Sequence, residues 1–141
     1  GDLTTAKRVL QEMKESGIQP DVKAFTIFIN VCADNRDIAG CEGWFDELIE
    51  SKVRPDTRVF TGVVTACARA GEPHKAWEWC RRMKEFNCRP DNYIYNAVVD
   101  AFSRVGDHEG AKMVLAEMEK AGVEARLTPS FHFLKSGAKT F

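Results

Sequence analysis

The hydrophobic residues of this chain follow a helical spacing along nearly its whole length. They recur at i, i+3, i+4 and i+7, the spacing that lines one face of an α-helix. The pattern sorts into pairs, each with a first and a second helix. It predicts first helices over 22–34, 57–69 and 92–104, and second helices over 37–50, 72–86 and 107–121, after one more second helix near the start.

Each predicted helix carries one apolar stripe, and we expect the stripes to form a shared core. In the first helices the stripe residues are Phe25, Phe28, Ile29, Cys32, Phe60, Val63, Val64, Cys67, Tyr95, Val98, Val99 and Phe102. In the second helices they are Ala6, Val9, Leu10, Met13, Cys41, Trp44, Phe45, Leu48, Ala76, Trp79, Cys80, Met83, Ala111, Val114, Leu115 and Met118.

This pattern repeats with a period of 35 residues, because the Pro-Asp pair at 20–21 returns at 55–56 and 90–91. A single helical pair cannot bury its stripe, whereas stacked pairs share a continuous core. We therefore expect an all-α fold, a right-handed α-solenoid of stacked helix-turn-helix hairpins. Its predicted units are a partial repeat at 1–21, repeats at 22–56, 57–91 and 92–126, and a partial repeat or capping helix at 127–141. The third full repeat ends irregularly, with Ala125-Arg126 in place of Pro-Asp.

Composition and charge exclude several classes of protein. The chain has 141 residues, 44% of them hydrophobic, and a net charge of −1, which argues against disorder and against a strongly basic nucleic-acid binder. The longest stretches without a charged residue are ten residues long, at 24–33 and 59–68, too short to cross a membrane. Five cysteines without a CxxC pair do not form a secreted disulfide framework.

No motif in the sequence predicts catalysis or a cofactor. The three histidines stand apart from one another and from cysteines, so we expect no metal site. A glycine-rich phosphate loop and a nucleophile–base pair are also missing from the sequence. The prediction is a binding protein that is not an enzyme, uses no cofactor and does not enter a membrane.

A 35-residue helical pair that ends in Pro-Asp resembles the pentatricopeptide-repeat family. Segments 12–21, 22–26 and 92–102 carry the resemblance, whereas the related tetratricopeptide repeat has a 34-residue period. The resemblance implies a sequence-specific, single-stranded RNA-binding module, one base per repeat, in an organellar factor for RNA processing, stability or translation. It also implies a mitochondrion or chloroplast as the location, and we expect any targeting segment to lie outside this sequence.

The resemblance further implies which residues select bases, namely the fifth and thirty-fifth residues of each repeat. They are Thr26 with Asp56, Thr61 with Asp91, and Asn96 with Arg126. In the family, Thr with Asp favours guanine, so the first two repeats predict two adjacent guanines. Asn96 suits a pyrimidine, although Arg126 departs from the expected acid.

Two other positions are implied to contact RNA. The second residue of each repeat stacks on the base, and here it is Lys23, Arg58, Tyr93 or Thr128, where the family usually has a branched aliphatic residue. A basic residue near the end of the first helix faces phosphate. Arg69 and Arg104 fill that position, whereas the first full repeat has Asp34.

Other interpretations of the same residues stay open. Thr26 and Thr61 suit an ordinary first helical turn, and Asp56 and Asp91 suit helix N-caps. The net charge is −5 over 37–50 but +2 over 57–69, so the acidity lies mostly in the second helices. This balance fits an alternative, a protein scaffold that contacts protein subunits of an organellar ribosome or polymerase. Self-association through an exposed end of the array is a third possibility.

Overall fold

The computed structural model describes residues 3–123, and within them it contains helices and no strand. The first helices are α2 (Val22–Asp34), α4 (Thr57–Arg69) and α6 (Asn92–Arg104). The second helices are α1 (Leu3–Glu15), α3 (Ile38–Glu50), α5 (Pro73–Arg82) and α7 (His108–Lys120). The predicted helices over 3–123 are thus confirmed. One differs in detail, because α5 ends at Arg82 and the short 3-10 helix η1 (Met83–Phe86) completes that segment.

The Pro-Asp pairs begin the first helices by capping them. Asp21, Asp56 and Asp91 lie in extended backbone, and the Oδ1 atom of each accepts a hydrogen bond from the backbone N–H three residues later, at 3.0–3.2 Å. Asp37 and Asp107 cap α3 and α7 in the same way. Each cap satisfies a backbone donor that has no partner within the helix.

The helices end in left-handed residues at two repeat positions. One position holds Gly17, Lys52, Asn87 and Gly122, and the other holds Arg36, Gly71 and Gly106, with φ between 56° and 81°. At each of these ends the next residue donates a backbone hydrogen bond back across the turn, as from Asp37 N to Cys32 O at 2.9 Å. This is the Schellman cap, which stops a helix and reverses the chain.

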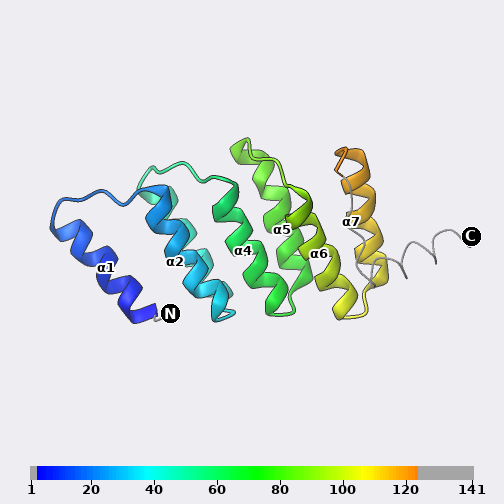
Figure 1. Ribbon diagram of the computed structural model, residues 1–141, viewed down its shortest axis with the longest axis horizontal. Coiled ribbons are helices and arrows are strands. Elements are labelled where there is room, and N and C mark those ends of the chain that lie inside the picture. The colour runs from blue at the N-terminus through cyan, green and yellow to red at the C-terminus, as the bar shows by residue number, and fades with distance from the viewer. Residues whose placement is uncertain (1–2, 124–141) are drawn as a thin grey trace, which may run out of the picture.

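The helices stack into two layers. The first-helix layer consists of α2, α4 and α6, and each packs against the next; α4 also packs against α3 and α5. The second-helix layer consists of α1, α3, α5 and α7. In Figure 1 the helices follow one another along the long axis, with the linkers between repeats at the upper edge and the turns within repeats at the lower edge. The expected α-solenoid is confirmed.

One continuous core runs between the layers. Trp44 and Trp79 are 6% and 5% exposed; the Trp44 ring packs against Phe28 with ring centroids 4.7 Å apart, and the Trp79 ring packs against Phe45 at 4.8 Å. Most residues of the predicted stripes are buried; Met13 and Leu115 are half-buried, and Val9 is 41% exposed. The prediction for Val9 was wrong because α1 packs mainly against α2, and no helix in the described part covers its other side.

Several predictions fall on residues outside the described part of the chain. They concern Arg126, the base-stacking position at Thr128, and the partial repeat or capping helix at 127–141. Within the described helices, none is both long and apolar enough to cross a membrane.

Candidate nucleic-acid interface

The fifth residues of the repeats lie in register on the first-helix layer. Thr26, Thr61 and Asn96 occupy equivalent positions on α2, α4 and α6, and all three are half-buried. Thr26 Oγ1 donates to the Val22 carbonyl at 2.7 Å, and Thr61 Oγ1 donates to the Thr57 carbonyl at 2.9 Å. Because the hydroxyl protons are used in this way, each oxygen can only accept a further hydrogen bond.

The thirty-fifth residues combine two functions in one side chain. In Asp56 and Asp91, Oδ1 caps the following helix, so the N-cap interpretation of these residues is correct. Capping uses one carboxylate oxygen and leaves the other available, and it also fixes the side chain at the start of the helix. The cap is therefore compatible with base selection by the second oxygen.

The two repeats differ at that second oxygen. Asp56 Oδ2 accepts hydrogen bonds from Arg58 Nη2 at 2.9 Å and Nε at 3.2 Å, whereas Asp91 forms no such ion pair in the described part. Arg58, predicted to stack on a base, is therefore held beside the base-selecting carboxylate. Tyr93, at the equivalent position of the next repeat, is 56% exposed, and Lys23 is also exposed.

The two arginines predicted to contact phosphate are both paired with carboxylates. Arg69 Nη1 lies 3.3 Å from Asp34 Oδ1 in the preceding repeat, and Arg104 Nε lies 2.8 Å from Asp100 Oδ2 on its own helix. These pairs are exposed and easily exchanged, since ion pairs at the surface are weak. They nevertheless reduce the positive charge that the first-helix layer presents.

A groove of about 640 Å³ runs between α4 and α6 and gathers several of these side chains. Tyr93, Asn96, Arg69 and Arg104 line it, together with Thr65, Ala68, Asn92, Ala97, Asp100 and Ala101. Asn96 Oδ1 is buried and has no hydrogen-bond partner in the described structure. A buried acceptor without a partner destabilises a protein unless a donor reaches it.

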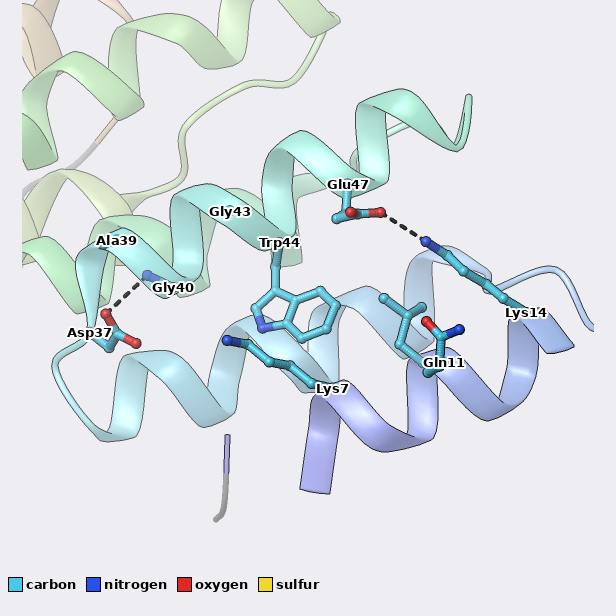
Figure 2. Close-up of a pocket in the computed structure, with 10 residues that line it drawn as sticks. Lys7, Gln11, Lys14, Asp37, Ala39, Gly40, Gly43, Trp44 and Glu47 are labelled. Carbon is cyan, nitrogen blue, oxygen red and sulfur yellow. Dashed lines mark hydrogen bonds and ion pairs between the residues drawn. The ribbon is translucent and has the colours of Figure 1, made fainter. Parts of the chain in front are cut away.

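The second-helix layer has a hollow of its own, between α1 and α3. Small residues on α3 open this groove of about 600 Å³, and Trp44 forms its floor. Figure 2 shows Lys7 extending toward Trp44 and Lys14 paired with Glu47 across the groove, at 3.1 Å between Nζ and Oε2. None of the residues predicted to contact RNA lines this hollow.

The cysteines are structural. Cys41, Cys67 and Cys80 are at most 1% exposed, and burial raises the pKa of the Cys67 and Cys80 thiols to about 12 and that of Cys41 still further. The predicted buried thiols are confirmed. Over residues 3–123, no three His, Cys, Asp or Glu side chains gather closely enough to hold a metal ion.

Sequence reasoning missed two residues, Asp100 and Thr65, and one contact, between Asp34 and Arg69, in the first-helix layer. Asp100 precedes Arg104 by four residues, a spacing that predicts a helical ion pair. Asp34 and Arg69 are one repeat apart, so their contact follows from the period once the first helices stack. Thr65 carries no signal in the sequence, because only the packing of α4 against α6 makes it a groove residue.

Comparison with known protein families gives two matches to repeat families. A model described as the pentacotripeptide-repeat region of PRORP matches residues 2–92, and one described as a pentatricopeptide repeat-containing protein matches residues 57–136. No curated protein matches the chain.

Solved structures of helical repeat proteins are similar over nearly the whole chain. The PPR domain of Arabidopsis thaliana protein-only RNase P 1 in complex with tRNA is 23% identical, with a TM-score of 0.81, covering 99% of this chain and 75% of that one. PPR10 in complex with an 18-nt psaJ RNA element is 25% identical, with a TM-score of 0.77 over 94% of this chain. PPR10 from maize is 23% identical, with a TM-score of 0.70, covering 84% of this chain and 17% of that one. The chain spans 19% of PPR10 in the RNA complex.

Proposed function

The chain belongs to the pentatricopeptide-repeat family, and from that premise we propose that it binds single-stranded RNA and selects one base per repeat. The observation that carries the proposal is the register of Thr26 with Asp56 and of Thr61 with Asp91 on consecutive first helices. Two neighbouring proteins of the same fold were solved with RNA, a tRNA in one case and an 18-nt element in the other. No catalytic step is part of the proposal.

The hydrogen-bonding capacity of each pair fits guanine. Thr61 Oγ1 can act only as an acceptor toward a base because its proton bonds the Thr57 carbonyl, and Asp91 keeps one carboxylate oxygen after capping α6. Guanine offers N–H donors along its pairing edge, and two acceptors in register satisfy them, directly or through water. The same argument applies to Thr26 with Asp56, where Arg58 shares the carboxylate.

The third repeat fits a different base. Asn96 Oδ1 is a buried acceptor that lacks a partner in residues 3–123, and it lines the groove between α4 and α6. A base that donates from its ring or exocyclic nitrogen would satisfy this oxygen, and the family resemblance assigns Asn96 to a pyrimidine. We therefore propose two guanines followed by a pyrimidine as the order read by α2, α4 and α6.

The wider role that we propose is that of an organellar factor in RNA processing, stability or translation, in a mitochondrion or chloroplast.

A stacked base contributes about 1–3 kcal/mol to the binding free energy, and micromolar affinity requires about 8 kcal/mol. Three repeats therefore bind weakly, and affinity is expected to rise with the number of repeats.

The test is a titration of the chain against short labelled strands by fluorescence anisotropy. Strands that differ only at two adjacent positions, GG, AA, CC or UU, are compared, and a tRNA is added as a folded competitor. We expect a preference for GG. Thr61→Asn should change the base preferred at the second of these two positions from guanine to a pyrimidine, because the amide can also donate a hydrogen bond to a base acceptor.

The matched control for this change is Thr65→Asn. Thr65 lies one turn further along α4 and is also half-buried, but it is not a fifth residue. Its replacement should leave base preference unchanged. Equal shifts for Thr61→Asn and Thr65→Asn, or indifference of the chain to all four strands, would contradict base selection.

The second candidate function is a protein scaffold in an organellar ribosome or polymerase. The observation in its favour is charge: α3 is acidic and flanks the hollow in Figure 2, while the groove arginines Arg69 and Arg104 are neutralised. Salt dependence separates the two functions. Binding through two RNA phosphates gives a log–log slope near −1.4, at about 0.7 per contact on a single strand, whereas a flat response favours the scaffold.

A further inference from the structure

The linkers that join consecutive repeats lie side by side along one edge of the molecule. Cys88 Sγ is 3.8 Å from the carbonyl oxygen of Pro55, so the linker before α6 touches the linker before α4. Both linkers are at the upper edge in Figure 1, opposite the turns within repeats. We call residues 52–55 and 87–90 the linker edge.

The linker edge presents one arginine per repeat. Arg54 and Arg89 occupy the same position of consecutive linkers, and both are exposed. In the described structure neither forms an ion pair, whereas Arg69 and Arg104 on the first-helix layer do. Arg54 and Arg89 can therefore bind a phosphate without first breaking an ion pair with a carboxylate.

Their position complements that of the base-selecting carboxylates. Arg54 lies two residues before Asp56, and Arg89 lies two residues before Asp91, with a proline between them in each case. The proline restricts the backbone, and the capping bond of the aspartate fixes the start of the helix, so each arginine projects from an ordered segment. A carboxylate that selects a base also repels the phosphates of the same strand, and a guanidinium beside it offsets that repulsion.

We propose that Arg54 and Arg89 bind the RNA phosphates, one per repeat, along the linker edge, in place of the paired arginines on the first-helix layer. The inference depends on the proposed RNA-binding function. The guanidinium group suits this ligand, since it can donate two parallel hydrogen bonds to one phosphate.

The test measures the salt dependence of RNA binding by the full chain, with a GG-containing strand and anisotropy at several salt concentrations. The double variant Arg54→Gln/Arg89→Gln is compared with Arg69→Gln/Arg104→Gln. A third variant, Arg36→Gln/Lys75→Gln, removes the same charge from two exposed residues near the turns within repeats, Arg36 in the turn before α3 and Lys75 in the first turn of α5. Circular dichroism of each variant checks that the helices are intact.

We expect the wild-type slope of about −1.4 to fall to near zero in Arg54→Gln/Arg89→Gln and to persist in the other two variants. An unchanged slope in that variant, or its loss in Arg69→Gln/Arg104→Gln alone, would overturn the inference and leave RNA binding in place. An equal loss in Arg36→Gln/Lys75→Gln would also overturn it, because net charge would then be the cause. If the wild-type chain binds no RNA, the proposed function fails, and the inference fails with it.

Discussion

Asp34 and Arg69 hold the same position in consecutive repeats, and their side chains meet at 3.3 Å between Oδ1 and Nη1. The carboxylate therefore occupies the guanidinium that was predicted to contact phosphate. Both side chains are exposed, 76% for Asp34 and 47% for Arg69, so the pair contributes at most about 1 kcal/mol to folding. Its main effect is on the electrostatic surface of the first-helix layer.

Replacing Asp34 with Asn should strengthen RNA binding. The change frees Arg69 to contact a phosphate, so the log–log salt slope should become steeper by about 0.7. Stability should change by less than about 1 kcal/mol, because the lost ion pair is exposed and a negative charge leaves the C-terminal end of α2. Anisotropy titrations and urea unfolding measure the two quantities.

The control for that variant is Asp46→Asn, which removes the same charge from an exposed residue of α3. It should leave the salt slope unchanged. Equal effects of the two replacements would show that only net charge matters and that Arg69 does not reach the RNA.

The helices and their order could be predicted from the sequence because local signals define them. Aspartate caps, left-handed chain reversals and apolar stripes all recur with the period, and each acts within a few residues. Contacts between repeats were harder to predict. Val9 has the spacing of a core residue but is 41% exposed, because burial of α1 depends on neighbouring helices.

In the candidate interface, too, the positions of residues could be predicted from the sequence, whereas their side-chain contacts could not. The register of Thr26, Thr61 and Asn96 follows from the period, whereas the unpartnered Asn96 Oδ1 and the pairing of Arg58 with Asp56 depend on side-chain conformation. The sequence identifies which residues face the interface. It does not tell which of their polar atoms are already engaged, and that decides which atoms can bind a ligand.

Gly62 allows α2 and α4 to approach closely. A Cβ atom at this position would lie 2.8 Å from Ile29 Cγ2 and 3.0 Å from Asn30 Oδ1, closer than van der Waals contact permits. Gly62→Ala should therefore lower the free energy of unfolding by about 1–3 kcal/mol, as α2 and α4 move apart. Gly43→Ala on α3 is the matched control, since its Cβ meets nothing within 4 Å and alanine favours a helix by up to about 1 kcal/mol. Urea unfolding should give opposite signs for the two variants, and equal signs would refute the packing argument.

The left-handed position 36/71/106 offers a route to a more stable array. Arg36 has φ 56°, where its equivalents are Gly71 and Gly106. A non-glycine residue in this region costs about 1–2 kcal/mol, and replacing it with glycine removes that cost. Glycine loses more conformational freedom on folding, which offsets about 0.5–1 kcal/mol of the stabilisation. Arg36→Gly should thus stabilise the protein by about 0.5–1 kcal/mol, whereas Gly71→Ala should destabilise it. Thermal unfolding checks both, and a lower Tm for Arg36→Gly would contradict the assignment of strain to this turn.

Stability should fall at alkaline pH because of the buried thiols. Burial raises the pKa of Cys67 and Cys80 to about 12 in the folded protein, and an exposed thiol in the unfolded chain has a pKa of about 8.5. Between these values the unfolded chain releases protons that the folded protein retains. The free energy of unfolding is therefore fully maintained below about pH 8.5 and decreases as pH rises, by up to about 1.4 kcal/mol per pH unit for each thiol.

Urea unfolding at several pH values between 7.5 and 10, with reductant present, measures this decrease. Cys67→Ala lowers stability at every pH because it leaves a small cavity, but it also removes one titrating thiol, so its pH dependence should be shallower than that of the wild type. The slope is the informative quantity, since a purely structural role for Cys67 would shift the whole curve without changing its shape. A variant curve parallel to the wild-type curve would show that ionisation of this thiol does not limit the stability of the core.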